Sequence, residues 1–189
     1  MQNKESRYFE SIIDVCKVIN SSLDLKEVLI LITENIVKLI NVKACTIFLL
    51  DKRRNELDVS ASYGLSETYL RKGPLDADKS IKETLDGQIV LVHDTSSDPR
   101  VQYPAEAKRE GIASVLSVPM TVKGQILGVL RIYSSEQRIF SDDEYKLISG
   151  LADIGGIAID NARMYDHLKS DHERLISDTH RWFEFGNMP

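Results

Sequence analysis

The spacing of apolar residues changes from helical to strand-like and back again along this chain, and no other feature constrains the fold as much. Between residues 8 and 19, apolar side chains recur every three or four positions, which predicts an amphipathic helix. Asp24, with Glu27 three residues later, has the form of an acidic capping box, and the apolar stripe after it predicts a second helix to residue 40. Ser141 and Glu144 repeat this signal before a long final helix.

Between these helices the apolar residues alternate with polar ones or form short continuous runs, which is typical of β-strands. Lys123-Gly124 separates the last two runs and favours a tight hairpin. Pro119 lies inside one of them and indicates an irregular position, because proline has no backbone N–H to donate to a neighbouring strand. The predicted strands are residues 44–50, 57–63, 89–92, 114–122 and 125–133.

Short helices are predicted between the strands. Ser80 and Glu83 form a third capping box before a helix of about two turns that ends at Gly87. Pro104 is well placed as the first residue of another short helix. Hairpins flanked by terminal helices predict an α+β fold, in which an antiparallel sheet carries helices on one face. The segment 64–114 then covers the other face and leaves a cavity against the sheet.

Composition and length exclude several classes of function. A chain of 189 residues accommodates one domain with a helical extension. The net charge is −5 and the charged residues are interspersed, so no nucleic-acid partner is expected. The N-terminus is polar and the apolar runs are too short to cross a bilayer, so we expect a cytoplasmic protein with no membrane partner. Cys16 and Cys45 lie in apolar runs, which favours buried, reduced thiols.

The order of these elements, together with particular residues, resembles the GAF family of sensory domains. The residues that carry the resemblance are Thr84-Leu85-Asp86-Gly87-Gln88-Ile89-Val90, Asp94, Asp98-Pro99-Arg100, Gly111, Ser114, Val118-Pro119-Met120, Gly124, Gly128-Val129-Leu130 and the run from Gly156 to Tyr165. The resemblance implies a GAF-like (profilin- and PAS-like) sheet, a small-molecule pocket between sheet and loops, and a homodimer formed through terminal helices. It divides the chain into an N-terminal helix (1–23), a GAF domain (24–166) and a helical extension with an aromatic tail (167–189).

The better-defined chemistries of the GAF family each require particular residues. Cyclic-nucleotide-binding members carry Asn-Lys…Phe-x-x-x-Asp-Glu, whose end Phe140, Asp143 and Glu144 match only with one spacing residue missing. Bilin-binding members and free methionine sulfoxide reductases need cysteines in the pocket, where neither cysteine of this chain is expected. Haem would need an axial histidine, for which His93 is the candidate within the domain. The ligand and any cofactor therefore stay unassigned.

Arg131 is the most informative single residue, because it lies in an apolar run where an unpaired charge would be costly. In one interpretation it points into the pocket and meets an anionic or carbonyl ligand. In the other it lies near a strand end and pairs with an acidic side chain. Both stay open, because a shift of one residue in strand register would turn Arg131 to the opposite face of the sheet.

Six further residues surround the expected cavity and are candidate ligand contacts: His93, Asp94, Arg100, Tyr103, Ile112 and Ser114. Each has a structural alternative. The histidine at a strand end would be partly exposed, and the aspartate would cap the turn that follows. Arg100 would pair with a neighbouring aspartate, and the last three would pack or cap around the short helix.

The end of the chain carries a heptad-like seam formed by Tyr165, Leu168, His172, Leu175, Thr179 and Trp182. The seam predicts either a dimeric coiled coil or a helix that folds back on the N-terminal helix of its own subunit. The aromatic residues Trp182, Phe183 and Phe185 could dock on a partner.

Three functions follow from these patterns. The first is a non-catalytic sensor that binds a small molecule and relays occupancy to a separate effector protein. The second is an interaction or dimerisation module with a vestigial pocket. The third, an enzyme similar to free methionine sulfoxide reductase, is disfavoured by the positions of the cysteines. Because no kinase, cyclase, phosphodiesterase or DNA-binding segment is recognisable, we expect the output to pass to another polypeptide or the chain to be part of a longer sensor.

Overall fold

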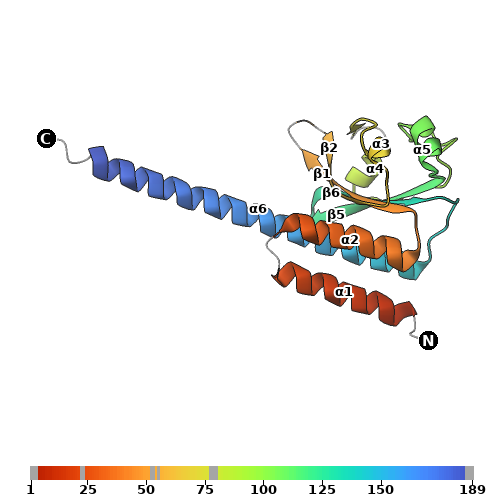
Figure 1. The fold of residues 1–189 in the computed structure, drawn as a ribbon, viewed down its shortest axis with the longest axis horizontal. Helices are drawn as coiled ribbons and strands as arrows, with labels where there is room; N and C mark the ends of the chain where they lie inside the picture. Colours follow the sequence, from red (N-terminus) through yellow and green to blue (C-terminus); the bar gives the residue numbers. More distant parts are fainter. Residues whose placement is uncertain (1–3, 22–23, 52–53, 55, 77–80, 186–189) are drawn as a thin grey trace.

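The structure, a computed structural model, describes residues 4–21, 24–51, 54, 56–76 and 81–185. Within these ranges, the side chains of residues 4–5, 18–21, 166 and 177–185 lie outside the description. The helices expected at the two ends are present as α1 (Lys4–Ser21), α2 (Leu25–Ile40) and α6 (Asp142–Phe185). Between them lies one antiparallel sheet with short helices on one face (Figure 1).

The capping signals at the starts of α2 and α6 are confirmed. The carboxylate of Asp24 accepts a hydrogen bond from the backbone N–H of Lys26 at 2.8 Å. Before α6, the backbone N–H of Ser141 donates to the Glu144 carboxylate at 2.9 Å, and the Glu144 N–H donates to the Ser141 hydroxyl at 3.3 Å. These reciprocal bonds satisfy N–H groups that the first turn of a helix otherwise leaves without partners, so they define where α6 begins.

The sheet contains six strands in the order β3-β2-β1-β6-β5-β4. All neighbouring strands are antiparallel. Both residues of the predicted Lys123-Gly124 turn have positive φ angles (52° and 75°), as a tight hairpin requires. Pro119 itself is in register with Val129, and the irregularity lies one residue further on, where the register shifts between Met120 and Thr121 and β6 carries an extra residue. The strands are β1 (Ala44–Asp51), β2 (Glu56–Tyr63), β3 (Leu75–Asp76), β4 (Val90–Val92), β5 (Ser114–Val122) and β6 (Gln125–Ser134).

The segment between β2 and β5 differs from its prediction. Two small elements, α3 (Glu67–Leu70) and β3, were not predicted, because a four-residue helix and a two-residue strand are too short to show a period. The predicted two-turn helix is α4 (Lys82–Leu85), a single turn that begins after Ile81 without a side-chain cap. Its proposed cap, Ser80, lies outside the described residues. α5 (Pro104–Glu110) has the predicted proline in its first turn and ends at Gly111.

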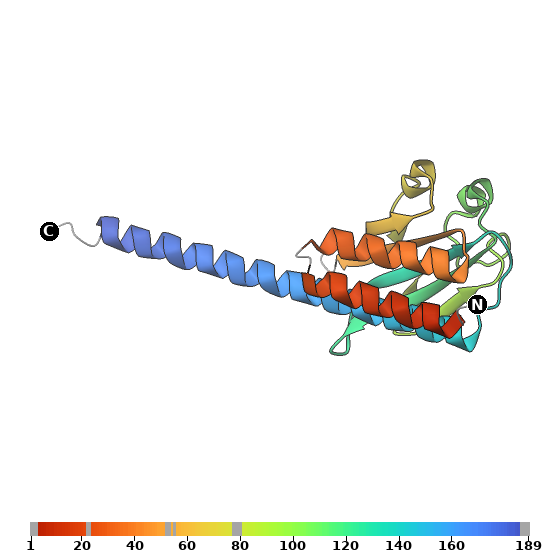
Figure 2. The same cartoon turned by 60° about the horizontal axis from the view of Figure 1, so that its bottom comes forward.

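The two faces of the sheet are covered differently. On one face, α2 and the first half of α6 pack on the sheet, and α1 lies against both helices as an outer layer (Figure 2). On the other face, α3, α4 and α5 and their connecting loops cover smaller apolar clusters. The second half of α6 projects away from the domain and does not fold back on α1 (Figure 1). The alternative of a helix folded back within one subunit is therefore wrong.

Candidate functional site

The strand registers place a row of polar residues across the middle of the sheet. Arg131 of β6 lies between Thr46 of β1 and Ser117 of β5, and Thr46 in turn pairs with Ser62 of β2. The hydroxyls of Thr46 and Ser62 are 2.9 Å apart and share a hydrogen bond. Because residues directly opposite one another in a sheet share a face, these four side chains form one polar row.

The apolar neighbours of this row show which face it occupies. Along β6, Val129 and Tyr133 belong to the clusters covered by the short helices, whereas Leu130 and Ile132 belong to the core under α2 and α6. Since successive side chains of a strand alternate between faces, Arg131 points toward the short helices and loops. The question of face that the sequence left open is settled in favour of the expected cavity.

Arg131 is a buried cation without a counterion in the described part of the chain. Its side chain is 6% exposed, and its Nε is buried and has no hydrogen-bond partner. None of the ion pairs among the described residues includes it. The charge lies near the ring of Tyr133, whose centroid is 5.8 Å from the guanidinium carbon. The predicted pairing of Arg131 with an acidic side chain is thus not observed among these residues.

Residues 66–76 and 94–112 together cover this cation, and we call these two segments the lid. The backbone N–H and hydroxyl of Ser66 both donate to the carboxylate of Glu110, which ties the start of α3 to the end of α5. The hydroxyl of Tyr103 donates to the carbonyl of Pro74 at 2.9 Å. The backbone N–H of Asp76 donates to the side-chain carbonyl of Gln102 at 3.0 Å. Hydrogen bonds therefore hold the two segments together at both ends.

Gly73 is needed where the two lid segments meet. Its φ of +125° disfavours any L side chain, and a Cβ at this position would lie 2.7 Å from the hydroxyl oxygen of Tyr103. Tyr103 can therefore pass close to the backbone of the first segment. The contact fixes its ring as a wall of the cavity beneath the lid.

Beneath the lid, the cavity around Arg131 has a volume of about 10 Å³, which is enough for about one water molecule. Its walls come from both lid segments and from the sheet, and they include Tyr69, Lys72, Thr95, Tyr103 and Val115. We call this space the inner cavity. It is the cavity predicted between sheet and loops, but it is small because the lid residues pack closely against the sheet.

Lys72 brings a second cation to the inner cavity. Its ammonium group lies 3.9 Å from the centroid of the Tyr69 ring and donates a hydrogen bond to the Tyr69 carbonyl at 3.2 Å. Burial, and then repulsion by Arg131, lowers the pKa of Lys72 to about 8. Glu110 and Glu106 of α5 oppose this shift. Arg131 therefore creates a positive potential that extends across the inner cavity.

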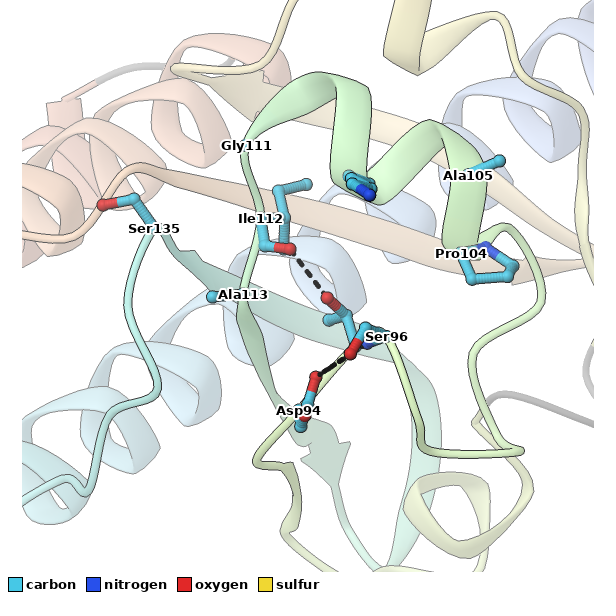
Figure 3. Close-up of a pocket in the computed structure, with 10 residues that line it drawn as sticks. Asp94, Ser96, Pro104, Ala105, Gly111, Ile112, Ala113 and Ser135 are labelled. Atoms are coloured by element: carbon cyan, nitrogen blue, oxygen red, sulfur yellow. Dashed lines mark hydrogen bonds between the residues drawn. The ribbon is translucent and has the colours of Figure 1, made fainter.

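A larger surface pocket of about 660 Å³ lies outside the lid, between α5, the loop after β4 and Ser135 (Figure 3). Three of its polar side chains, those of Asp94, Thr95 and Ser96, are already engaged within the protein. Asp94 accepts hydrogen bonds from the backbone N–H and the hydroxyl of Ser96, and the Thr95 hydroxyl donates to the Ile112 carbonyl (Figure 3). Thr95 lines both spaces, so the pocket and the inner cavity share a wall. Because the unpaired charge lies in the inner cavity, the candidate site is there despite its smaller volume.

The structure separates the predicted contact residues into groups. Arg131 and Tyr103 meet at the inner cavity, while Asp94 and Ile112 border the surface pocket. Arg100 forms ion pairs with Asp98 and Glu83 and so fastens its own loop, as its structural alternative predicted. The remaining two contribute to neither space: His93 is exposed, and the hydroxyl of Ser114 donates to the Glu136 carbonyl at 2.7 Å.

The cysteines lie away from the inner cavity. Cys45 is fully buried in the core under α2 and α6, and burial raises the pKa of its thiol. Cys16 is on α1, in the outer helical layer, and is only partly buried, so the expectation of two buried thiols is wrong for this residue. A thiolate is the reactive form of cysteine, so neither position supplies a nucleophile to the inner cavity. Within the described residues, no group of three or more potential metal ligands lies close together.

An antiparallel sheet that carries helices on one face and a closed lid over a charged cavity on the other defines an α+β fold. The family model described as "GAF domain" matches residues 22–160, and the chain belongs to the GAF family. None of the helices among the described residues combines the length and the apolar character needed to span a bilayer.

The curated relatives are regulators and sensors. The chain is 23% identical to the formate hydrogenlyase transcriptional activator of Salmonella typhimurium over 93% of its own length, but over only 26% of that protein. It is 27% identical to the methyl sulfide methyltransferase-associated sensor of Methanosarcina acetivorans, covering 85% of this chain and 17% of the relative. The chain therefore spans about a quarter or less of the relatives it matches.

Solved structures share the fold at low sequence identity. The GAF domain of a phosphoenolpyruvate-protein phosphotransferase from Coxiella burnetii superposes with a TM-score of 0.77 at 20% identity, covering 88% of this chain and 99% of that one. Free methionine-R-sulfoxide reductase from Neisseria meningitidis gives a TM-score of 0.71 at 18% identity, covering 87% and 95%. Since a sensory domain and an enzyme share this fold, the fold alone does not assign the activity.

Lys72, Tyr69 and Thr46 are among the residues of the site that the sequence analysis missed. Lys72 follows an unpredicted one-turn helix, and an isolated lysine in a polar segment gives no signal of burial. Thr46 lies in a strand that was predicted correctly, but its place beside Arg131 depends on the pairing of β1 with β6. A proposed register for β1 and β6 would have placed Thr46 beside Arg131.

Proposed function

We propose that this chain is a non-catalytic sensory domain that binds a small molecule between the sheet and the lid and relays its occupancy through α6 of a homodimer. The observation that carries the proposal is the double role of α6. Its first half forms the core behind β5 and β6, with Leu147, Ile148 and Leu151 buried. Its second half leaves the domain as an uncovered helix (Figure 1).

The uncovered half of α6 has an apolar side that suits a second copy of the same helix. Leu168 and Leu175 are 66% and 67% exposed, and Met164 and Tyr165 are also about half exposed. Tyr165, Leu168, His172 and Leu175 continue the predicted heptad seam, whereas the side chains of Thr179 and Trp182 lie outside the described residues. A helix of this length with apolar residues at alternating spacings of three and four favours a two-stranded coiled coil.

The regulatory relatives support a signalling role in the cytoplasm, with the output produced by a separate effector protein or another part of a longer chain. A ligand that binds one lid conformation better than another shifts the balance between the two conformations. Because α6 packs on the back of the strands that carry Arg131, a change in the lid and sheet reaches α6 directly. The aromatic residues Trp182, Phe183 and Phe185, whose side chains lie outside the described residues, stay candidates for contact with the effector.

Sedimentation velocity of the full chain tests the dimer. We expect the wild type to sediment as a dimer at micromolar concentration, and Leu168→Glu or Leu175→Glu to sediment as a monomer, because each places like charges in the seam. Ser170→Glu adds the same charge about 200° around the helix from Leu168 and should leave the dimer intact. A monomeric wild type, or equal effects of all three substitutions, would overturn the proposed relay.

A second candidate function is an interaction module with a vestigial pocket. The observation that favours it is the small volume of the inner cavity, about 10 Å³, beneath a closely packed lid. Thermal unfolding in the presence of a metabolite library of neutral, cationic and anionic compounds separates the two functions. Stabilisation by any compound supports the sensor, whereas a library without a binder, together with an intact dimer, supports the interaction module.

A further inference from the structure

We propose that the inner cavity binds a small monocarboxylate, with its carboxylate on the guanidinium of Arg131. The inference deepens the proposed function, because it assigns a chemical class to the ligand of the same pocket. It rests on a charged side chain that is 6% exposed, lines the cavity and has no counterion among the described residues.

The chemistry of Arg131 favours an oxyanion over a neutral ligand. A guanidinium presents a rigid, planar set of donors that matches the two oxygens of a carboxylate, and such paired bonds are among the strongest hydrogen bonds in proteins. Ser117 lies directly opposite Arg131 on the same face and carries a hydroxyl, a group that can donate to an oxyanion, whereas the Thr46 hydroxyl is already hydrogen-bonded to Ser62. No carboxylate of the described residues competes for Arg131.

The balance of charge around the cavity favours a single negative charge. Lys72 also faces the cavity from the lid, where burial and Arg131 lower its pKa to about 8 and Glu110 and Glu106 of α5 only partly oppose that shift. Glu110 is also fastened to Ser66 and is not free to move to Arg131. Lys72 has a lowered pKa and so loses its charge readily, whereas Arg131 has no carboxylate partner among the described ion pairs, and a monoanion neutralises it.

The dimensions and the walls of the cavity favour a small ligand with an apolar end. Tyr69, Tyr103 and Val115 supply apolar surface around the guanidinium, and the cavity volume is about 10 Å³. Even a short fatty acid therefore has to displace part of the lid. Gln102 and Tyr103 separate the inner cavity from a surface groove of about 390 Å³, so a movement of these two side chains would admit the ligand.

Isothermal titration calorimetry of the full chain with sodium formate, acetate, propionate and butyrate tests the proposal, with sodium chloride at equal ionic strength as the reference. We expect saturable binding with one site per chain and an affinity that passes through an optimum within the series. Arg131→Met should abolish binding, and Arg131→Lys should weaken it roughly tenfold or more, because lysine cannot form the paired bonds. Arg109→Met removes an exposed arginine of α5 and should leave the affinity unchanged.

Proton uptake gives a readout that a merely structural role of the cavity would not produce. A bound carboxylate raises the pKa of Lys72 from about 8, so binding at pH 8.5 should take up a fraction of a proton. The groups facing Lys72 are Arg131, Tyr69, Tyr103, Glu106 and Glu110. Titrations in two buffers of different ionisation enthalpy measure the uptake, which Lys72→Met should remove while binding is retained at lower affinity.

The outcomes separate this inference from the proposed function. No carboxylate binding, or equal binding by wild type and Arg131→Met, overturns the monocarboxylate site. Tighter binding of inorganic phosphate or sulfate than of any carboxylate also overturns it. If a neutral compound from the metabolite library then occupies the pocket, the sensor proposal stands without this ligand class. If no compound of any class binds, both proposals fail together.

Discussion

Replacing Arg131 with methionine should stabilise the protein in buffer that contains no carboxylate. Methionine keeps much of the length of the arginine side chain and its flexibility, so it can fill the same space beside Val129 and Tyr133. The substitution removes the positive charge together with the buried Nε, which has no hydrogen-bond partner. The folded state then no longer holds an unpaired ion away from water.

The expected magnitude follows from two opposing contributions. Holding an ion in a protein interior costs several kcal/mol after relaxation and partial access of water. The contact between the guanidinium and the Tyr133 ring returns about 1–2 kcal/mol of this cost and is lost in the variant. The free energy of unfolding should therefore rise by about 2 kcal/mol. For a chain of this size, that increase raises the melting temperature by about 4–8 °C.

Urea unfolding followed by far-UV circular dichroism, in Tris chloride at pH 7.5, measures this change. Arg109→Met is the control, because that arginine is exposed on α5 and its removal should change the free energy of unfolding by less than about 0.5 kcal/mol. A loss of more than about 1 kcal/mol in Arg131→Met would refute the reasoning. It would mean that a carboxylate of the chain itself neutralises Arg131, so that the residue serves the fold.

Three further predictions concern other buried groups. The pKa of Lys72 is lowered to about 8 from an unfolded value near 10.5, so the protonated lysine destabilises the fold below pH 8. The free energy of unfolding of the wild type should therefore rise between pH 8 and 9.5, and that of Lys72→Met should rise less. Urea midpoints at each pH measure the difference. Cys45 should resist Ellman's reagent until the protein unfolds, because burial raises the pKa of its thiol, whereas the half-buried Cys16 should react in the native state; early modification of both would contradict this. Glu144→Ala removes a buried carboxylate that caps α6 and pairs with Arg138, and it should lower the free energy of unfolding by about 2–3 kcal/mol. Asp143→Ala removes an exposed carboxylate of the same turn and should lower the free energy of unfolding by less than about 0.5 kcal/mol.

The elements of this fold that were predictable are those with a local cause. The caps at Asp24 and Ser141 and the turn at Lys123-Gly124 each depend on hydrogen bonds or φ angles within a few residues, and all three are present. The long helices were predictable because their buried faces repeat many times. α4 was predicted too long, because a capping signal marks a position where a helix can begin but does not ensure that a helix begins there.

The candidate site was predictable only in part, because its essential contacts join residues far apart in the sequence. Arg131 was recognised as unusual from its apolar neighbours alone. Its orientation depended on strand register, and the absence of a counterion among the described residues depended on where the acidic side chains of the lid point. Arg100 shows the opposite outcome, since two carboxylates reach it and it only fastens its own loop.

The position of Arg131 also explains how a ligand as small as a carboxylate could affect a helix on the far side of the sheet. A ligand that binds the folded state stabilises it by RT ln(1 + [L]/Kd), and the gain comes from neutralising a charge that the fold otherwise holds unpaired. The side chains next to Arg131 along β6, Leu130 and Ile132, point to the opposite face and belong to the core that α6 helps to form. Ligand and output helix are thus separated by one layer of backbone. A ligand that neutralises the charge acts on one face of β6, and α6 packs against the other face of the same sheet. A direct connection through β6 is therefore enough to link the ligand to α6.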